Sequence, residues 1–328
     1  MSNTLVSIVM VTRGLKNYLR LCLDSALKQT YPSYEVIVID NSLDPDFGRG
    51  IGKDYPGIKL YPSAENLFYC QALNRGIALS SGEFILCLND DVVLDKDFLK
   101  EALRGFSRDS KIGMVSGKIL RADGKTIDST GLFLSVWRSA KERGYGLPDT
   151  GRFEREEYIF GVNGAVAFYR GKMLDELRIN SWFDCAHHRE YFDSDFHIFY
   201  EDLDIAWRAQ RAGWKGYYIS QAIAYHTRGG TVRAAEGIGK RFARHYLDDG
   251  LCVDLIKNRW LAIIKNETLP GFLSSWPFIV LYDCAMGVYL LFFRPQVVKK
   301  LIAGILKYPP SALNKRRLLS RHAFLKNP

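Results

Sequence analysis

Apolar residues in the first third of the chain form short continuous runs that alternate with longer segments of helical period. The short runs predict strands at Val6–Val11, Glu35–Ile39, Ile58–Tyr61 and Phe84–Leu88. The longer segments repeat apolar residues every three or four positions and predict helices at Asn17–Gln29, Gln71–Leu79 and Asp95–Phe106. Strands that alternate with helices predict an α/β fold, in which helices cover both faces of a mostly parallel sheet.

The middle of the chain is less regular. Ile112 to about Ser135 is rich in strand-forming residues, whereas the charged, glycine-containing stretch Arg138–Glu157 predicts a mobile loop. Asn180–Asp195 combines aromatic and acidic residues and predicts an irregular loop. Further strands are expected at Val166–Tyr169, Tyr217–Ile219 and Ala222–Tyr225, and helices at Lys172–Leu177 and Glu201–Ala212.

The last part of the chain has a different pattern. Gly239–Lys265 predicts a helix, and the apolar run Phe272–Phe293 is nearly long enough to cross a bilayer. Pro277 and Asp283 interrupt this run, while its aromatic residues and the flanking Arg and Lys suit a membrane interface. We therefore expect a helical hairpin or in-plane helices at the interface. The alternatives are a single spanning helix and a buried helix pair that packs on the rest of the protein.

Composition and charge indicate the domain organisation and a binding partner. With 328 residues and 47% hydrophobic content, the chain can form one large domain and an appendage. The segment from Arg294 to Pro328 contains nine Lys and Arg and no acid, which equals the net charge of +9. Such a segment attracts an anionic partner. Its charges are interleaved with apolar residues and no nucleic-acid motif is present, so we expect an anionic membrane surface and no nucleic acid.

The cysteines and the N-terminus indicate the compartment. Six cysteines are scattered without CxxC spacing, which is typical of reduced thiols in a cytoplasmic protein without disulfides or a zinc site. The apolar run Leu5–Val11 is short and no basic segment precedes it, so it predicts a first strand and no signal peptide.

Candidate chemistry lies where the predicted strands end. Asn89-Asp90-Asp91 follows the buried run Phe84–Leu88, and adjacent carboxylates are costly to bury without a partner. Mg²⁺ or Mn²⁺ carrying a diphosphate would be such a partner. Thr12 and Asp40 end two other strands, and open α/β sheets bind ligands beyond the carboxyl ends of their strands. These positions predict one ligand-binding crevice.

Several segments, in order, resemble those of the family 2 glycosyltransferases of the GT-A fold. They extend over most of residues 5–231: Ile8–Thr12, Val36–Ser42, Asn66 with Asn74-Arg75-Gly76, Asn89-Asp90-Asp91 in place of the DxD motif, Phe192-Asp193 through Glu201-Asp202-Leu203-Asp204 to Arg208 and Gly213, and His226 before Gly229-Gly230-Thr231. The branch that the chain resembles most is that of bacterial rhamnosyltransferase-like enzymes of surface-polysaccharide assembly. The chain departs from the pattern at Arg13, where Asn is common, and at Leu67, where Gly is usual. Asn180–Tyr191 resembles an insertion.

The resemblance implies a GT-A catalytic domain over residues 1–235, with a nucleotide-sugar half at about 1–120 and an acceptor half at about 121–235. Residues 236–328 form the helical, membrane-associating region. The implied activity is metal-dependent, inverting transfer of a sugar, rhamnose favoured, from a dTDP- or UDP-sugar to a lipid-linked glycan acceptor. The implied location is cytoplasmic, peripheral on the inner face of the cytoplasmic membrane.

The resemblance also implies roles for individual residues. The metal ligands would be Asp91 and His226, with Mg²⁺ or Mn²⁺ as the ion. The catalytic base would be Asp202, supported by Glu201. The remaining residues are assigned by ligand: Thr12, Asp40, Asn66, Asn74, Asn89 and Asp90 to the nucleotide-sugar, with Asp40 accepting from the pyrimidine N3–H, and Asn163 and Gly164 to the acceptor.

The helix that begins at Glu201 carries two more expectations. A carboxylate in the first turn interacts favourably with the helix dipole, so the pKa of Asp202 should be lowered. Asp204 and Arg208 are four residues apart and should form an intrahelical pair. Two other functions are compatible with the sequence: a nucleotidyltransferase, although only Arg13-Gly14 resembles the required glycine-rich basic loop, and a non-catalytic membrane-bound scaffold.

Overall fold

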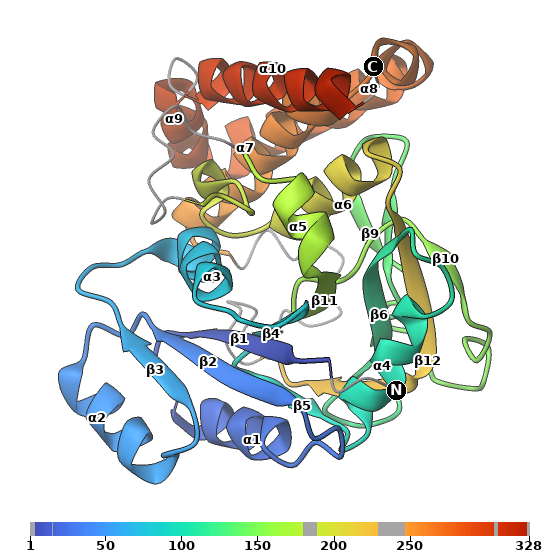
Figure 1. Ribbon diagram of the computed structural model, residues 1–328. Coiled ribbons are helices and arrows are strands. Elements are labelled where there is room, and N and C mark those ends of the chain that lie inside the picture. Colours follow the sequence, from blue (N-terminus) through green and yellow to red (C-terminus); the bar gives the residue numbers. More distant parts are fainter. Residues whose placement is uncertain (1–3, 15, 180–188, 229–246, 305–307, 327–328) are drawn as a thin grey trace.

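The structure is a computed structural model that describes residues 4–14, 16–179, 189–228, 247–304 and 308–326 (Figure 1). Its strands are β1 (Val6–Thr12), β2 (Tyr34–Asp40), β3 (Lys59–Pro62), β4 (Phe84–Asn89), β5 (Val92–Leu94), β6 (Ile112–Arg121), β7 (Ile127–Ser129), β8 (Leu132–Leu134), β9 (Ala140–Glu142), β10 (Glu157–Ile159), β11 (Val166–Arg170) and β12 (Lys215–His226). Its helices are α1 (Lys16–Ala26), α2 (Pro45–Asp54), α3 (Phe68–Ala78), α4 (Phe98–Phe106), α5 (Gly171–Glu176), α6 (Glu201–Arg211), α7 (Asp249–Asn266), α8 (Leu269–Phe293), α9 (Pro295–Gly304) and α10 (Tyr308–Lys326), with a 3₁₀ turn, η1, at Ser194–Phe196.

Ten strands form one mixed sheet in the order β10-β12-β6-β11-β4-β1-β2-β3, with β5 paired to β12 and β7 to β6. The four strands β4, β1, β2 and β3 run parallel, as the alternation of strands and helices predicts. The antiparallel strand β11 joins them to β6. At the far end of β12, the antiparallel register with β5 places His226 opposite Val92, next to Asp91 in the chain. Strand pairing therefore brings His226 close to Asp91, although the two residues are far apart in sequence.

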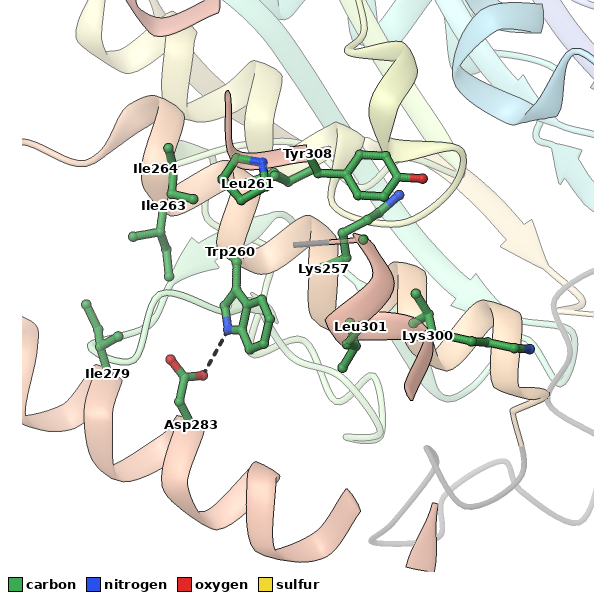
Figure 2. A pocket seen from close by; sticks show the side chains of 13 residues that line it. Lys257, Trp260, Leu261, Ile263, Ile264, Ile279, Asp283, Lys300, Leu301 and Tyr308 are labelled. Carbon is green, nitrogen blue, oxygen red and sulfur yellow. Dashed lines mark hydrogen bonds between the residues drawn. The ribbon is translucent and has the colours of Figure 1, made fainter. Parts of the chain in front are cut away.

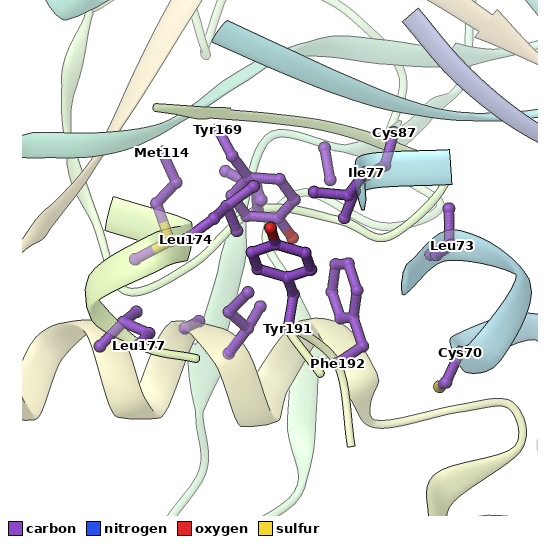
Figure 3. Packing of buried hydrophobic residues seen from close by; sticks show 14 of the residues in the cluster. Cys70, Leu73, Ile77, Cys87, Met114, Tyr169, Leu174, Leu177, Tyr191 and Phe192 are labelled. Carbon is purple, nitrogen blue, oxygen red and sulfur yellow. The ribbon is translucent and has the colours of Figure 1, made fainter. Parts of the chain in front are cut away.

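Apolar layers cover both faces of the sheet. Alternate residues of the central strands point to opposite sides: Val9 and Ile37 contribute to one layer, Ile8 and Val38 to the other. The first layer includes side chains of α3, α5 and α6, and Figure 3 shows Tyr169 and Tyr191 packed at its centre. The second layer includes side chains of α1, α2 and α4. This double coverage explains why these strands are continuous apolar runs in the sequence.

Pro45–Asp54, where the sequence is compatible with a loop or a short helix, forms a helix that Asp44 caps by accepting a hydrogen bond from Asp46 N. Other local predictions need correction. The expected loop Arg138–Glu157 contains β9, which pairs with β8. The two strands expected near residue 220 are one strand, β12, with a register shift between Ile219 and Ile223. Most of the expected insertion Asn180–Tyr191, the residues 229–231 and the start of the helix expected from Gly239 lie outside the described residues.

The helices α7 to α10 gather on one side of the molecule, at the top of Figure 1. Among them, α8 is 25 residues long and apolar enough to cross a membrane by length and composition, but only 11% of its most apolar window is buried. It is therefore not a buried core helix. Large exposed apolar side chains line its outer surface: Phe272, Leu273, Trp276, Val280, Leu281, Val288, Leu291, Phe292 and Phe293.

Charged pairs attach α8 to the rest of the protein near its start and at its middle. At its start, Glu267 pairs with Arg138, which also donates to Gly271 O at 2.9 Å. In its middle, Asp283 accepts from Arg259 Nη1 of α7 at 2.6 Å. These contacts hold α8 alongside the globular body and leave its opposite, apolar face exposed.

Candidate active site

The predicted acidic crevice lies where β1, β2 and β4 end side by side. Thr12 Oγ1, at the end of β1, donates to Asp90 Oδ2 at 2.7 Å. Burial and the neighbouring Asp91 raise the pKa of Asp90 to about 6, although the hydrogen bond from Thr12 opposes the shift. Asn89 Oδ1 accepts from Tyr69 Oη at 2.7 Å. Thr12 thus orients one of the carboxylates, and its contact with the nucleotide-sugar stays a prediction.

His226 lies between two acids and is almost fully buried. Its Nδ1 is 2.9 Å from Asp128 Oδ2, and its Nε2 is 3.3 Å from Asp91 Oδ1. Burial lowers the pKa of His226, but the contacts with Asp128 and Asp91 outweigh burial and raise the pKa to about 9. Arg228 donates to the other oxygen of Asp128 at 2.6 Å. A metal ion bound by Nε2 would replace the proton there, because imidazole binds metals only in its neutral form, and the ion would take over the positive charge beside Asp91.

The residues present fit a divalent ion. His226 Nε2 is buried and has no well-formed hydrogen bond within the described part of the chain, so it can act as a ligand. The described residues include no cluster of three or more His, Cys, Asp or Glu that could hold a metal by themselves. Asp91 and His226 would thus supply two ligands, and donor phosphates the others, which is common for Mg²⁺. Asp128, which sequence reasoning missed, would orient the imidazole.

Asp40 lines a separate cavity of ≈ 610 Å³ at the end of β2. Its Oδ1 accepts from Ser42 N at 3.0 Å, the turn geometry typical of Asp. Asp40 is buried, and a Cβ on Gly48 would lie 2.7 Å from Asp40 Oδ2, so a larger residue at position 48 would crowd this oxygen. The cavity is of a size typical of small-molecule sites.

A second cavity, of ≈ 320 Å³, is lined by Asn66, Asn89, Asp90 and Asp91. Four of the predicted binding residues therefore share one space. Asn74 does not line it in the described structure: its Oδ1 accepts from the backbone N–H groups of residues 191 and 192, and its Nδ2 donates to a carbonyl. The amide of Asn74 is fully used in holding this backbone together.

Asp202, the candidate base, is connected to Asn89 through Tyr69 and Gly164. Tyr69 Oη lies 3.4 Å from Gly164 O, and Gly164 N donates to Asp202 Oδ2 at 3.0 Å. Asp202 is in the first turn of α6, where Leu203 N donates to its Oδ1 at 2.7 Å. Burial outweighs these hydrogen bonds and raises the pKa of Asp202, so the expected lowering is wrong. A higher pKa makes this carboxylate a stronger base.

Two further acids surround Asp202. Burial, with Asp202 as the second cause, raises the pKa of Glu201 to about 8. Glu142 on β9 accepts from Asn163 Nδ2 at 2.6 Å and from Ser129, and burial raises its pKa to about 8. Sequence reasoning missed Glu142 because it lies in a stretch that was expected to be a mobile loop. Glu142 positions Asn163, which precedes the glycine that contacts Asp202.

Helix α7 completes the site. The sequence did not indicate that this helix contributes to it. Asp248, Leu251 and Asp254 from the start of α7 line the same cavity as Asp90 and Asp91. Asn258 Nδ2 donates to the carbonyls of residues 196, 198 and 199, which precede Glu201 in the chain. Residues 197, 199 and 200 have positive φ, so this segment is strained and needs such support.

The chain belongs to glycosyl transferase family 2, whose model matches residues 7–178, more than half of its length. Membership decides against the nucleotidyltransferase alternative. The chain is 28% identical to the amylovoran biosynthesis glycosyltransferase AmsB of Erwinia amylovora, over 69% of this chain and 71% of that protein. It is 25% identical to an N-acetylglucosaminyl-diphospho-decaprenol L-rhamnosyltransferase of Mycobacterium tuberculosis, over 67% and 75%.

A third relative is much longer than this chain. An uncharacterized protein of Sinorhizobium fredii is 28% identical over 78% of this chain, but the match spans only 27% of that protein.

Solved structures show that the fold is GT-A. The mannosyltransferase PcManGT of Pyrobaculum calidifontis, in complex with GDP-Man and Mn²⁺, superimposes with a TM-score of 0.53 over 98% of this chain and 86% of that one, at 15% identity. GalNAc-T7 with UDP, GalNAc and Mn²⁺ has a TM-score of 0.55 over 80% and 48%, at 14% identity. The predicted fold class and family are confirmed.

Proposed function

We propose that the protein is a metal-dependent, inverting glycosyltransferase that moves a sugar from a dTDP- or UDP-sugar to a lipid-linked glycan acceptor. One observation carries the proposal. The chain of contacts from Asn89 through Tyr69 and Gly164 to Asp202 joins the acidic strand ends to a buried carboxylate of raised pKa. A donor bound along this path would present its reacting carbon to a base.

Asp40 favours a pyrimidine donor. Its Oδ2 lies beside Gly48, which lines the same ≈ 610 Å³ cavity, and could accept a hydrogen bond from the N3–H of uracil or thymine. The diphosphate would then extend toward Asp91 and His226. A divalent ion bound there would act as a Lewis acid that stabilises the charge on the leaving diphosphate.

Asp202 would take the proton of the acceptor hydroxyl while that oxygen attacks the sugar from the face opposite the diphosphate. This displacement inverts the configuration at the reacting carbon. The raised pKa of Asp202 suits a base near neutral pH. Glu201 and Glu142, whose pKa values are about 8, are protonated at neutral pH and so do not add negative charge beside Asp202.

The acceptor and the location follow from the C-terminal region and from the relatives. The names of two relatives refer to amylovoran biosynthesis and to a diphospho-decaprenol acceptor with rhamnose, which supports a lipid-linked acceptor and favours rhamnose here. The exposed apolar face of α8 and the basic segment that follows it suit an in-plane position on an anionic membrane surface at the cytoplasmic side.

Two carboxylate variants test the chemistry. Asp202→Asn should bind nucleotide in a metal-dependent manner, as the unchanged protein does, and lose transfer by at least two orders of magnitude. Asp91→Asn should lose the metal dependence of nucleotide binding. Both are measured by calorimetric titration of UDP and dTDP with and without Mn²⁺, and by turnover of a panel of UDP- and dTDP-sugars. Transfer by Asp202→Asn near the unchanged rate would rule out the base, and no turnover of any donor by the unchanged protein would favour the scaffold alternative.

Membrane association has its own test. Leu281→Asp changes a side chain of α8 that is 65% exposed, and Leu21→Asp changes a similarly exposed leucine of α1, on a different part of the surface. Co-sedimentation with phosphatidylglycerol vesicles should be reduced several-fold by the first change and unaffected by the second. Equal sedimentation of the two variants would contradict an in-plane α8.

A further inference from the structure

A third cavity lies between the C-terminal helices, away from the acidic crevice. It has a volume of ≈ 300 Å³ and is walled by apolar side chains of α7, α8, α9 and α10. Figure 2 shows Trp260, Leu261, Ile279, Leu301 and Tyr308 around it. Asp283 also lines the cavity, and its carboxylate accepts from Arg259 at 2.6 Å and from the indole N–H of Trp260 at 3.3 Å, so its charge is compensated by Arg259. A cavity of this composition binds hydrocarbon.

Two lysines line the cavity, and only Lys300 leaves a positive charge at its edge. Lys257 Nζ donates to Asp195 O at 2.6 Å and lies 2.8 Å from Asp254, so its charge is neutralised within the protein. Lys300 is exposed, and Figure 2 shows its side chain extending away from the cavity. The ammonium of Lys300 therefore lies outside the apolar walls, where it can pair with an anionic group that stays outside the cavity. The chemistry is that of an apolar chain with an anionic head.

Helix α7 connects this cavity with the candidate active site. Asp254 lines the cavity that contains Asp91, and Lys257, one helical turn later and paired with Asp254, lines the apolar cavity. One turn advances the helix by about 5 Å, so the two cavities lie on adjacent parts of one helix. Ile279 lines the apolar cavity from α8, whose opposite face is the exposed apolar surface. The apolar cavity thus lies between the proposed membrane plane and the site of transfer.

We infer that this cavity binds part of the isoprenoid chain of a diphosphate-linked acceptor, with the diphosphate near Lys300 and the glycan directed along α7 to Asp202. The inference rests on the proposed function and specifies how the acceptor is held. A single chain fits a cavity of ≈ 300 Å³ better than the paired chains of a phospholipid. The chain would enter from the bilayer at the α8 surface, and the bound head group would stay at the protein side of the interface.

Matched variants test the cavity. Leu301→Trp adds an indole from the wall of the cavity and fills it, whereas Ile302→Trp adds the same ring at the next position, which is 64% exposed and does not line the cavity. Lys300→Glu reverses the charge at the cavity edge, and Lys299→Glu reverses its exposed neighbour. Binding is measured by calorimetry with farnesyl diphosphate, which has three isoprene units, dimethylallyl diphosphate, which has one, and inorganic diphosphate.

Farnesyl diphosphate should bind at least ten-fold more tightly than dimethylallyl diphosphate or inorganic diphosphate, because only a longer chain fills the apolar space. Leu301→Trp and Lys300→Glu should each weaken its binding about ten-fold, and the two control variants less than two-fold. Affinity that is independent of chain length, or equal losses in Leu301→Trp and Ile302→Trp, would overturn the inference. So would displacement of farnesyl diphosphate by an equal concentration of dioctanoyl phosphatidylglycerol, which would assign the cavity to an ordinary lipid chain.

The failure of this inference can be distinguished from failure of the proposed function. Hydrolysis of a UDP- or dTDP-sugar without acceptor requires the donor site alone, and Leu301→Trp should leave its rate within two-fold of the unchanged protein. Donor hydrolysis without binding of farnesyl diphosphate would refute only the lipid cavity. Binding of farnesyl diphosphate without turnover of any nucleotide sugar would refute the transferase and leave a lipid-binding protein.

Discussion

Lys265 on α7 is the cation on which the junction between the C-terminal helices and the catalytic part depends. It is fully buried, with Nζ 2.5 Å from Asp193 and 2.9 Å from Asp204. Asp193 is also paired with Lys315 of α10, and burial, which raises its pKa, is outweighed by Lys265 and Lys315, so that the pKa is lowered well below its usual value. Asp204 accepts from Arg208 at 3.0 Å, the intrahelical pair that the sequence predicts.

Lys265→Met should destabilise the protein by about 3 kcal/mol. Removing one member of a buried ion pair typically costs about 3–5 kcal/mol, because the other charge stays buried. The lower figure applies here, since Asp193 keeps Lys315 and Asp204 keeps Arg208. A loss of this size is a large part of a typical stability of roughly 5–15 kcal/mol. It should lower the melting temperature by about 5 °C or more.

The assay is thermal and urea unfolding followed by circular dichroism. Lys299→Met, at an exposed position on α9, is the control and should change stability by less than about 0.5 kcal/mol. Adding Asp193→Asn to Lys265→Met should restore part of the loss, because it removes one of the buried charges left behind. If Lys265→Met unfolds within about 1 kcal/mol of the unchanged protein, the reasoning about this junction is wrong.

Three other predictions concern the candidate site. Gly48→Ala should weaken UDP and dTDP binding at least ten-fold in calorimetry, because the new methyl group would lie 2.7 Å from the Asp40 oxygen; unchanged affinity would rule out this oxygen as the base contact. Asp128→Asn should reduce the affinity for Mn²⁺, measured in the presence of UDP, by about 10–100-fold, since the histidine loses the carboxylate that orients it. Burial raises the pKa of Glu142 from 4.5 to about 8, so between these pH values Glu142 holds a proton in the folded protein but not in the unfolded chain. The free energy of unfolding should therefore fall as pH rises through this window. Glu142→Gln should flatten that fall in urea unfolding at pH 5 to 8.

The division of the chain into residues 1–235 and 236–328 remains a prediction. Several contacts connect the two parts. Lys265, Asn258 and Lys315 all lie after residue 235 and bind groups of the catalytic part. A protein that ends at residue 235 would leave Asp193 without either of its lysines. We therefore regard the C-terminal helices as part of the folded unit that holds the candidate site together.

Local patterns in the sequence determined the fold class and one wall of the site. Continuous apolar runs at β1, β2 and β4 predict strands buried on both faces, and polar residues that directly follow such strands must meet at one edge of a parallel sheet. This reasoning placed the ends of β1, β2 and β4 side by side, because strand direction and side-chain alternation are local properties. It did not show that Asp40 lines a different cavity from Asn89, Asp90 and Asp91.

The tertiary structure decided everything that depends on distant pairing. His226 meets Asp91 only through the register of β12 with β5, and Asp128 reaches the same histidine from β7. The pKa of Asp202 is raised because burial outweighs its hydrogen bonds, and the whole fold determines that burial. Its position in the first turn of a helix, taken alone, therefore predicted a pKa shift of the wrong sign. The apolar run near the C-terminus was compatible with a helical hairpin, in-plane helices, a spanning helix or a buried pair, and the structure forms one 25-residue helix, α8. Pairs with the distant residues Arg138 and Arg259 hold this helix along the protein surface, and composition alone does not say which charges a helix will meet.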